Sequence, residues 1–246
     1  MQDPAIENKN PVSIKKVMAI ALCGYVALYL LAQHWQPVFA ARGLSTAVAD
    51  VPARVLLKFS AAGAFVVCTG LLLWTRKSCR LDWRKLYGYM GATALVGPVG
   101  EVVFNNTFRL LSGGPLWQYH ILPVHRGDTS RYSFFLWSLY GVYLYFLHRK
   151  TTAAPGERRD YLLALLIAVD AIFLEFVTNI GSLFYLRTLV FYYFPSDIGH
   201  LTTALVSPFY FLGGLALVHT LQRFIRDPVF FGSLGYLVSF TFFFLR

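Results

Sequence analysis

Long apolar runs, separated by short polar segments, dominate the chain. Seven runs could each form a helix: 17–35, 54–75, 87–111, 131–148, 161–186, 201–222 and 229–245. A helix needs about 20 mostly apolar residues to cross a bilayer, because each residue advances it by about 1.5 Å. The pattern predicts an all-α polytopic membrane protein with about seven transmembrane helices, organised as one domain over residues 1–246.

The composition supports this prediction. Hydrophobic residues make up 57% of the chain and charged residues only 14%, whereas about 25% of the residues in soluble proteins are charged. No small-residue cleavage site clearly follows the first apolar run, so we expect a retained helix there and not a cleaved signal peptide.

The positions of the positive charges that give the net charge of +10 indicate which loops face the cytoplasm. Lys and Arg gather before the first run, from Lys9 to Lys16, and in alternate loops at 76–85, 149–159 and 223–226. Cytoplasmic loops carry such an excess of positive charge. We therefore expect a cytoplasmic N-terminus, an outer C-terminus, and a location in the bacterial inner membrane or its equivalent. This distribution argues against nucleic acid as a partner, and leaves membrane lipids and a hydrophobic small molecule.

Two segments of the chain resemble each other. Residues 101–148 align with 175–219 after a two-residue deletion, with these pairs: Glu101 and Glu175, Asn105 and Asn179, Trp117 and Phe191, Tyr119 and Tyr193, Pro123 and Pro195, Gly127 and Gly199, Trp137 and Phe209, Gly141 and Gly213. His148 and His219 each fall near the expected cytoplasmic end of their span. We interpret this as an internal repeat, with units at about 87–148 and 161–222, each holding two helices. Both units enter from the same side, so the repeat is parallel. The alternative is chance similarity in a composition rich in Phe, Tyr, Leu and Gly.

Three acidic residues fall inside predicted spans, namely Glu101, Asp170 and Glu175. A carboxylate in the middle of a bilayer costs several kcal/mol unless it is paired, solvated or protonated. Each glutamate is followed four residues later by Asn105 or Asn179, which places the pair on one helix face. An amide can hold a neighbouring carboxyl in either protonation state. We predict a functional pocket with the three acids as catalytic groups. The alternative is that these polar groups only hold helices together.

The outer loops and the helices that follow them supply candidate substrate-binding residues: Asn105, Asn179, Trp117, Tyr119, Tyr193, His200 and Trp137. Aromatic residues there could equally be anchors at the membrane interface. The histidines could have ordinary solvated or capping roles.

The sequence lacks the motifs of several kinds of catalytic and metal-binding site. The chain has no HExxH, GxSxG or P-loop motif. Cys23, Cys68 and Cys79 form no CxxC pair, so neither a disulfide framework nor a thiolate metal site is indicated. We predict no metal site, although Glu101, Glu175 and His200 could in principle meet around one. The sequence indicates no particular cofactor.

Residues 114–141 resemble a segment of a bacterial family labelled as putative ABC-transporter membrane components. The shared pattern is an aromatic-x-Tyr, a Pro, a Gly and a helix with Trp and Gly, here Trp117, Tyr119, Pro123, Gly127, Trp137 and Gly141. Two positions depart from that family. Gln118 stands where the family has an acidic residue, and Asp128 stands where it has an arginine.

The chain is also similar in kind to integral-membrane isoprenoid cyclases, the meroterpenoid and lycopene cyclases. This resemblance implies that intramembrane acids protonate a polyene or epoxide and that aromatic faces stabilise a carbocation. The paired acidic motif of those cyclases is missing.

Three functions are compatible with these patterns. The first is a membrane enzyme that acts on a lipid or isoprenoid, as a cyclase or isomerase does, by acid/base chemistry. The second is a proton-coupled transporter or exporter subunit, which would need broken helices near the site. Gly97 and Pro98 supply one candidate break, whereas the run before Glu175 is uninterrupted. The third is a non-catalytic assembly partner.

Overall fold

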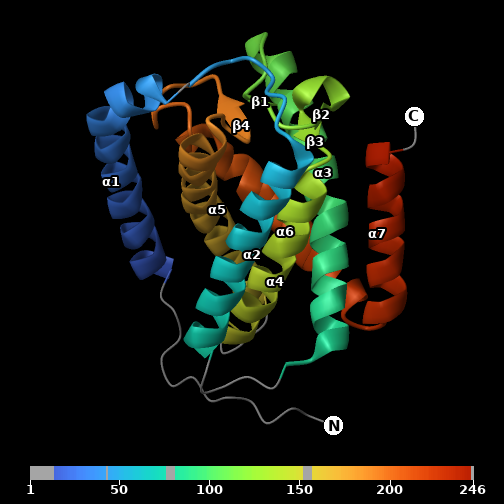
Figure 1. Cartoon of the computed structure of the whole chain (residues 1–246). Helices are drawn as coiled ribbons and strands as arrows, with labels where there is room; N and C mark the ends of the chain where they lie inside the picture. Colours follow the sequence, from blue (N-terminus) through green and yellow to red (C-terminus); the bar gives the residue numbers. More distant parts are fainter. Residues whose placement is uncertain (1–13, 43, 76–80, 152–156, 245–246) are drawn as a thin grey trace.

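The computed structural model describes residues 14–42, 44–75, 81–151 and 157–244. These residues form seven α-helices: α1 (Ile14–Ala41), α2 (Ala53–Thr75), α3 (Trp83–Ser112), α4 (Ser133–Thr151), α5 (Glu157–Leu186), α6 (Ser207–Phe224) and α7 (Pro228–Phe244). They lie where the apolar runs predicted helices (Figure 1). The mainly helical fold is therefore confirmed, whereas the short strands described below were not expected. Lys9 and Cys79 lie outside the described residues.

Four helical stretches in the described part of the chain are long and apolar enough to cross a membrane. They are Ile14–Ala41, Ala53–Leu71, Arg159–Leu186 and Ala204–Phe224. The helix α7 is apolar but shorter. In contrast, α3 carries several polar residues and packs against α4, α6 and α7, so many of its side chains face protein.

The helix α3 is continuous, which corrects the break expected at Gly97 and Pro98. It begins where the Asp82 side chain accepts hydrogen bonds from two backbone N–H groups of the first turn, as an N-cap residue does. It ends at Gly113, which has a φ of 81°, in the left-handed conformation that glycine adopts easily.

Short strands and 3-10 turns gather at one end of the bundle (Figure 1). The strand β1 (Trp117–Tyr119) pairs antiparallel with β4 (Phe191–Tyr193), and β2 (Pro123–Val124) with β3 (Thr129–Ser130). The 3-10 turns are η1 (His125–Gly127) and η2 (Ala204–Val206). In the first pair Gln118 lies opposite Tyr192, so β1 and β4 join the loop after α3 to the loop after α5.

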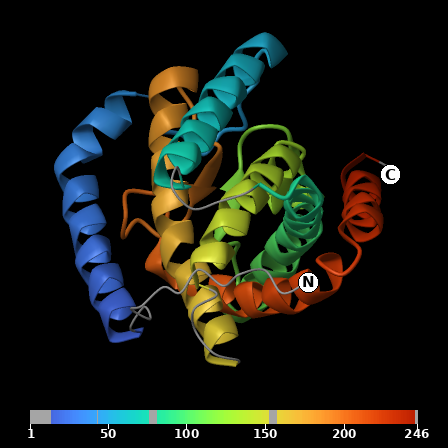
Figure 2. The ribbon, with the colours of Figure 1, turned by 90° about the horizontal axis from the view of Figure 1, so that it is seen from below.

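Two views place α1 and α7 on opposite sides of the bundle (Figures 1 and 2). Two apolar clusters are buried in the bundle, one around Tyr119 and Phe191, to which α1 contributes, and the other around Leu144 and Leu163. Large apolar side chains stay exposed along α1, α2 and α7, as expected for helices that face lipid tails.

Candidate functional site

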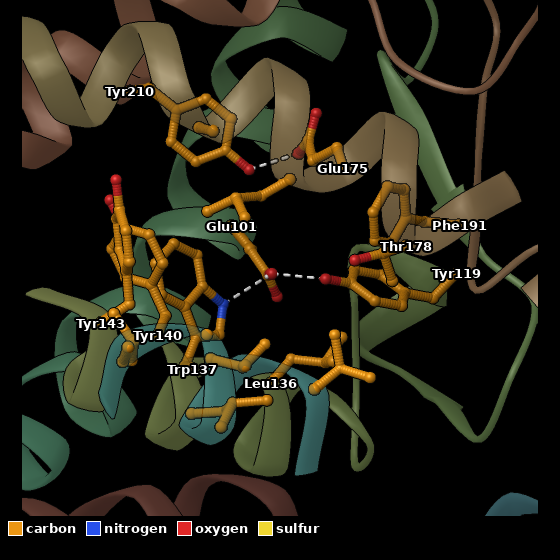
Figure 3. A pocket seen from close by; sticks show the side chains of 17 residues that line it. Glu101, Tyr119, Leu136, Trp137, Tyr140, Tyr143, Glu175, Thr178, Phe191 and Tyr210 are labelled. Carbon is orange, nitrogen blue, oxygen red and sulfur yellow. Dashed lines mark hydrogen bonds between the residues drawn. The ribbon is translucent and has the colours of Figure 1, made fainter. Parts of the chain in front are cut away.

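A cavity of about 410 Å³ lies within the helix bundle. Glu101 of α3 and Glu175 of α5 both line it, as Figure 3 shows. The sequence alone left open whether these residues share one pocket, and the structure places them in the same one. Residues of α2, α4 and α6 and of the β1–β4 pair complete the wall.

Four side chains donate hydrogen bonds to the carboxylate of Glu101. On Oε1 these are the hydroxyl of Tyr119, at 2.5 Å, and the indole Nε1 of Trp137, at 2.8 Å. On Oε2 they are the hydroxyl of Thr129 and that of Ser133, the latter at 3.1 Å. A carboxylate has about four acceptor sites, so this donor set satisfies Glu101 and fixes its orientation.

Three hydroxyl groups hold Glu175 in a similar way. Tyr193 donates to Oε1 at 2.6 Å and Tyr210 donates to the same oxygen. Thr202 donates to Oε2 at 2.7 Å. In the described part of the chain Oε2 accepts only this one hydrogen bond, so it retains capacity for a proton or a ligand.

The donors of the two glutamates follow the same order along the chain. Each carboxylate binds a tyrosine 18 residues later. A threonine follows, 28 residues after Glu101 and 27 after Glu175. An aromatic residue of the next helix comes last, Trp137 for one and Tyr210 for the other. The alignment made from sequence paired Trp137 with Phe209, which is one residue out of register with these contacts.

The glycines of α4 and α6 show the same one-residue correction. A Cβ on Gly141 would overlap the backbone of Met90, and one on Gly214 would press on the backbone of Ala164. Both glycines thus allow α4 and α6 to approach the preceding long helix closely. By this contact Gly141 corresponds to Gly214, where the sequence alignment chose Gly213.

Asn105 and Asn179 bind loop backbone, which corrects the expectation that they orient the glutamates. The Asn179 amide donates to the carbonyls of Phe191 and Leu201, and its Oδ1 accepts from the N–H groups of Val190 and Phe191. The side chain of Asn105 makes the same two kinds of contact with the backbone at Leu116 and Trp117. Each asparagine therefore ties the strand that follows its helix to that helix. Their direct part in substrate binding stays a prediction.

A buried ion pair that we did not predict supports the first loop. Asp128 is 2% exposed, and its carboxylate binds the guanidinium of Arg109 and the amide of Asn105. An arginine near the end of an apolar helix and an acid in the next loop were the available signals. Asp128 is also a position that departs from the transporter-like family, and here it has a structural contact.

Asp170 lies behind the wall of the main cavity. Its carboxylate accepts hydrogen bonds from the hydroxyls of Tyr143, at 2.7 Å, and Tyr140, at 3.5 Å, and both of these tyrosines line the cavity. Asp170 therefore does not line the cavity and is connected to it only by the hydrogen bonds of these two tyrosines. Its catalytic role stays a prediction. Sequence reasoning missed Tyr140, Tyr143 and Tyr210.

The remaining predicted residues divide between wall and loop. Tyr119 and Trp137 line the main cavity. Tyr193 does not line it, but its hydroxyl donates a hydrogen bond to Glu175, which does. The Trp117 indole donates to the carbonyl of Asp128. A hydrogen bond joins His200 Nδ1 to the carbonyl oxygen of Tyr193, so His200 belongs to the loop.

His120 is buried in the loop after α3 and stacks on Tyr192 with ring centroids 5.7 Å apart. Neither of its ring nitrogens has a hydrogen-bond partner in the structure. Burial lowers the pKa of His120 to about 4, so the ring is neutral at pH 7. This histidine packs in the loop as a flat, uncharged ring.

A second, much smaller cavity of about 50 Å³ lies beside the first. Glu101, Trp137 and Tyr210 line both. Phe104 and Phe209 also line the small cavity, with their ring centroids 5.3 Å apart.

The charges around the main cavity are all acidic. Among its described lining residues none is Lys, Arg or His. Within the described ranges no three His, Cys, Asp or Glu side chains come together in a way that could hold a metal ion.

No protein-family model, curated protein or solved structure matches the chain. Its function is therefore inferred from the chemistry of the cavity.

Proposed function

We propose that the protein is a membrane-embedded enzyme that isomerises or cyclises an apolar lipid or isoprenoid by acid/base chemistry. The observation that carries this proposal is that Glu101 and Glu175 line one mainly apolar cavity with six aromatic rings. A polar pair inside apolar walls suits a substrate that is hydrophobic over most of its surface and reacts at one point.

The hydrogen bonds give the two glutamates different roles. Glu101 is held by four donors, so its carboxylate acts as a fixed negative charge. Glu175 keeps an acceptor position on Oε2 and exchanges the proton with the substrate. A positioned acid or base of this kind contributes about 10²–10⁴-fold to a reaction rate.

The reaction needs no oxidant or reductant. Protonated Glu175 donates its proton to one carbon of a double bond, and the other carbon becomes cationic. A neighbouring double bond then closes a ring onto this carbon, or the charge stays where it formed. The Glu175 carboxylate removes a proton from the adjacent carbon, which restores both a double bond and the acid. The product is an isomer of the substrate, and the aromatic walls stabilise the cation.

We also propose that the two halves arose by duplication and cross the membrane in parallel, with seven spans, a cytoplasmic N-terminus and an outer C-terminus. The matching donors of Glu101 and Glu175 support a common origin. The register of β1 and β4 does so too, because Trp117 pairs with Tyr193 and Tyr119 with Phe191. Exchange of the two halves leaves this register unchanged, as a two-fold axis between the strands requires.

The two cavities fit the same two-fold relation. Glu175, Thr178 and Leu136 line the large cavity. Their counterparts in the other half are Glu101, Phe104 and Phe209, which line the small one. On this proposal the large and small cavities are copies, and the two phenylalanines fill the second copy.

The transporter interpretation receives less support. Transporters bind substrates at discontinuous helices, whereas α3 and α5 run unbroken past both glutamates. The resemblances to transporter components and to cyclases stay predictions.

The test replaces each glutamate with its uncharged isostere, in Glu101→Gln and Glu175→Gln variants and in the double variant. Asp160→Asn is the matched control, because Asp160 lies on α5 away from the cavity wall. Lipid extracts of cells that express each variant are compared by mass spectrometry, and thermal unfolding is followed in detergent.

We expect Glu175→Gln to abolish a lipid change that the native protein and the control both produce. The double variant should lose no more than Glu175→Gln alone, because the two carboxyls serve one reaction. If the variants unfold at much lower temperature and no expressing cell shows a lipid change, the glutamates only hold helices together and the enzyme proposal is wrong.

A further inference from the structure

We infer that the main cavity binds a lipophilic cation, that is, a ligand with a positive charge inside an apolar body. This inference deepens the proposed function and shares its site. It also makes a statement about affinity that can be measured without turnover.

The aromatic wall is the first observation. Six rings line the cavity: Tyr119, Trp137, Tyr140, Tyr143, Phe191 and Tyr210. The faces of such rings attract a cation within about 6 Å of the ring centroid, and more strongly when water is excluded. The rings of Trp137 and Tyr210 lie 6.5 Å apart and bring the α4 and α6 sides of the wall together.

The charge balance is the second observation. Glu101 accepts four hydrogen bonds on its two carboxylate oxygens, which suits its ionised form, and Glu175 becomes ionised when it gives up its proton in the proposed reaction. The described lining residues include no basic side chain. One carboxylate without a counter-ion in a low-dielectric site is costly, and a second one, formed when Glu175 ionises, adds to that cost. A bound cation removes this cost, whereas an anion would increase it.

The shape of the cavity sets the rest of the ligand. A volume of about 410 Å³ falls within the range of sites for drug-sized molecules. On the α2 side the wall is apolar, with Val66, Val67 and Leu71. This side would take the apolar body while the charge lies near the carboxylates.

The experiment compares two probes of the same shape and opposite charge, tetraphenylphosphonium and tetraphenylborate. Binding of each to the purified full chain in detergent is measured by equilibrium dialysis. We expect the phosphonium to bind at least about tenfold more tightly than the borate. Glu175→Gln should weaken phosphonium binding by about tenfold or more and leave borate binding unchanged or stronger.

A second pair of variants locates the binding. Gly70 lines the cavity, and a Cβ there would meet nothing within 4 Å, so a leucine side chain can enter the cavity. Gly63 lies on the same helix with equally open surroundings, but it does not line the cavity. Gly70→Leu should abolish phosphonium binding, whereas Gly63→Leu should preserve it at a similar unfolding temperature.

Equal binding of the two probes, or no binding of either, would overturn the inference. Phosphonium binding that survives both Glu175→Gln and Gly70→Leu would overturn it too, because the cation would then bind elsewhere. These results do not depend on the lipid extracts. A lipid change lost in Glu175→Gln without cation selectivity would leave the enzyme proposal standing, and selective binding without any lipid change would count against the enzyme alone.

Discussion

The indole of Trp137 packs against Gly97 at a point where α3 carries no side chain. A Cβ at this position would overlap the indole ring. The same indole donates its Nε1 proton to Glu101 at 2.8 Å. Gly97 therefore determines how closely α4 approaches α3, and through Trp137 it determines the position of the first carboxylate.

Gly97→Ala should lower the free energy of unfolding, because an added methyl group in a packed interior costs about 1–3 kcal/mol. Gly100→Ala is the matched control. It lies on the same helix, and its Cβ would be 3.6 Å from the ring of Phe104, an ordinary contact. Chemical unfolding in detergent measures both. Equal loss in the two variants would contradict the role assigned to Gly97.

Asn179→Asp should destabilise the loop after α5. The native Nδ2 donates to two buried carbonyls, of Phe191 and Leu201, and an aspartate oxygen cannot donate to either. Each carbonyl left without a partner costs about 1–3 kcal/mol, so we expect a loss of at least about 2 kcal/mol in unfolding free energy.

Asn106→Ala serves as the comparison for this substitution. Asn106 is only half-buried on α3, where water can replace its contacts with Val102 and Arg109. Its 3.3 Å hydrogen bond to Asp128 can be lost while that carboxylate keeps Arg109 and Asn105. The loss in this variant should be clearly smaller in the same unfolding measurement. If Asn179→Asp were as stable as Asn106→Ala, the four bonds of Asn179 would not hold the loop.

The positions of the helices could be predicted because a bilayer imposes long apolar runs. The ends were harder to predict. A helix was expected from residue 201, yet α6 begins at Ser207. The intervening residues form a turn that brings the hydroxyl of Thr202 to Glu175. The start of α3 at Trp83, before the apolar run, follows from the cap at Asp82.

Residues of the site could be predicted only where burying the side chain costs free energy. Glu101 and Glu175 were recognised because a carboxylate inside an apolar run needs a reason. Tyr140 and Tyr210 were missed because tyrosine is common in both lipid-facing and buried helices. The alignment of the proposed repeat was one residue out because it placed a two-residue deletion before α4 and α6. The threonines that bind the glutamates, 28 residues after Glu101 and 27 after Glu175, require a deletion of one residue.

His120 should make stability depend on pH. Burial lowers the pKa of the folded-state ring to about 4, while an unfolded histidine titrates near 6.5. Between these pH values His120 is protonated in the unfolded chain and neutral in the folded protein. Stability is therefore complete above about pH 6.5, and falls by about 1.4 kcal/mol per pH unit as the pH drops toward 4.

His120→Phe tests this dependence, because phenylalanine keeps a ring against Tyr192 and does not titrate. The unfolding free energies of the native protein and the variant are compared from pH 4 to 8. The difference between them should grow as the pH falls. Parallel profiles would show that His120 is protonated as easily in the folded protein as in the unfolded chain.

The last prediction concerns the small cavity beside Glu101. If it is a filled copy of the large one, installing the residues of the large cavity should open it. The double substitution Phe104→Thr and Phe209→Leu does this, because Thr178 and Leu136 occupy the corresponding places in the large cavity. The lost ring contacts should cost about 2–5 kcal/mol of unfolding free energy.

An opened apolar cavity stays dry and accepts apolar guests such as xenon. We therefore expect xenon to stabilise the double variant more than the native protein, measured as a shift in unfolding temperature under xenon pressure. Phe65→Leu on α2 is the control, because Phe65 is exposed and its truncation leaves no enclosed space. If xenon stabilises all three proteins equally, the two phenylalanines do not fill a second copy of the cavity, and the two-fold relation would have to be limited to the glutamates and their donors.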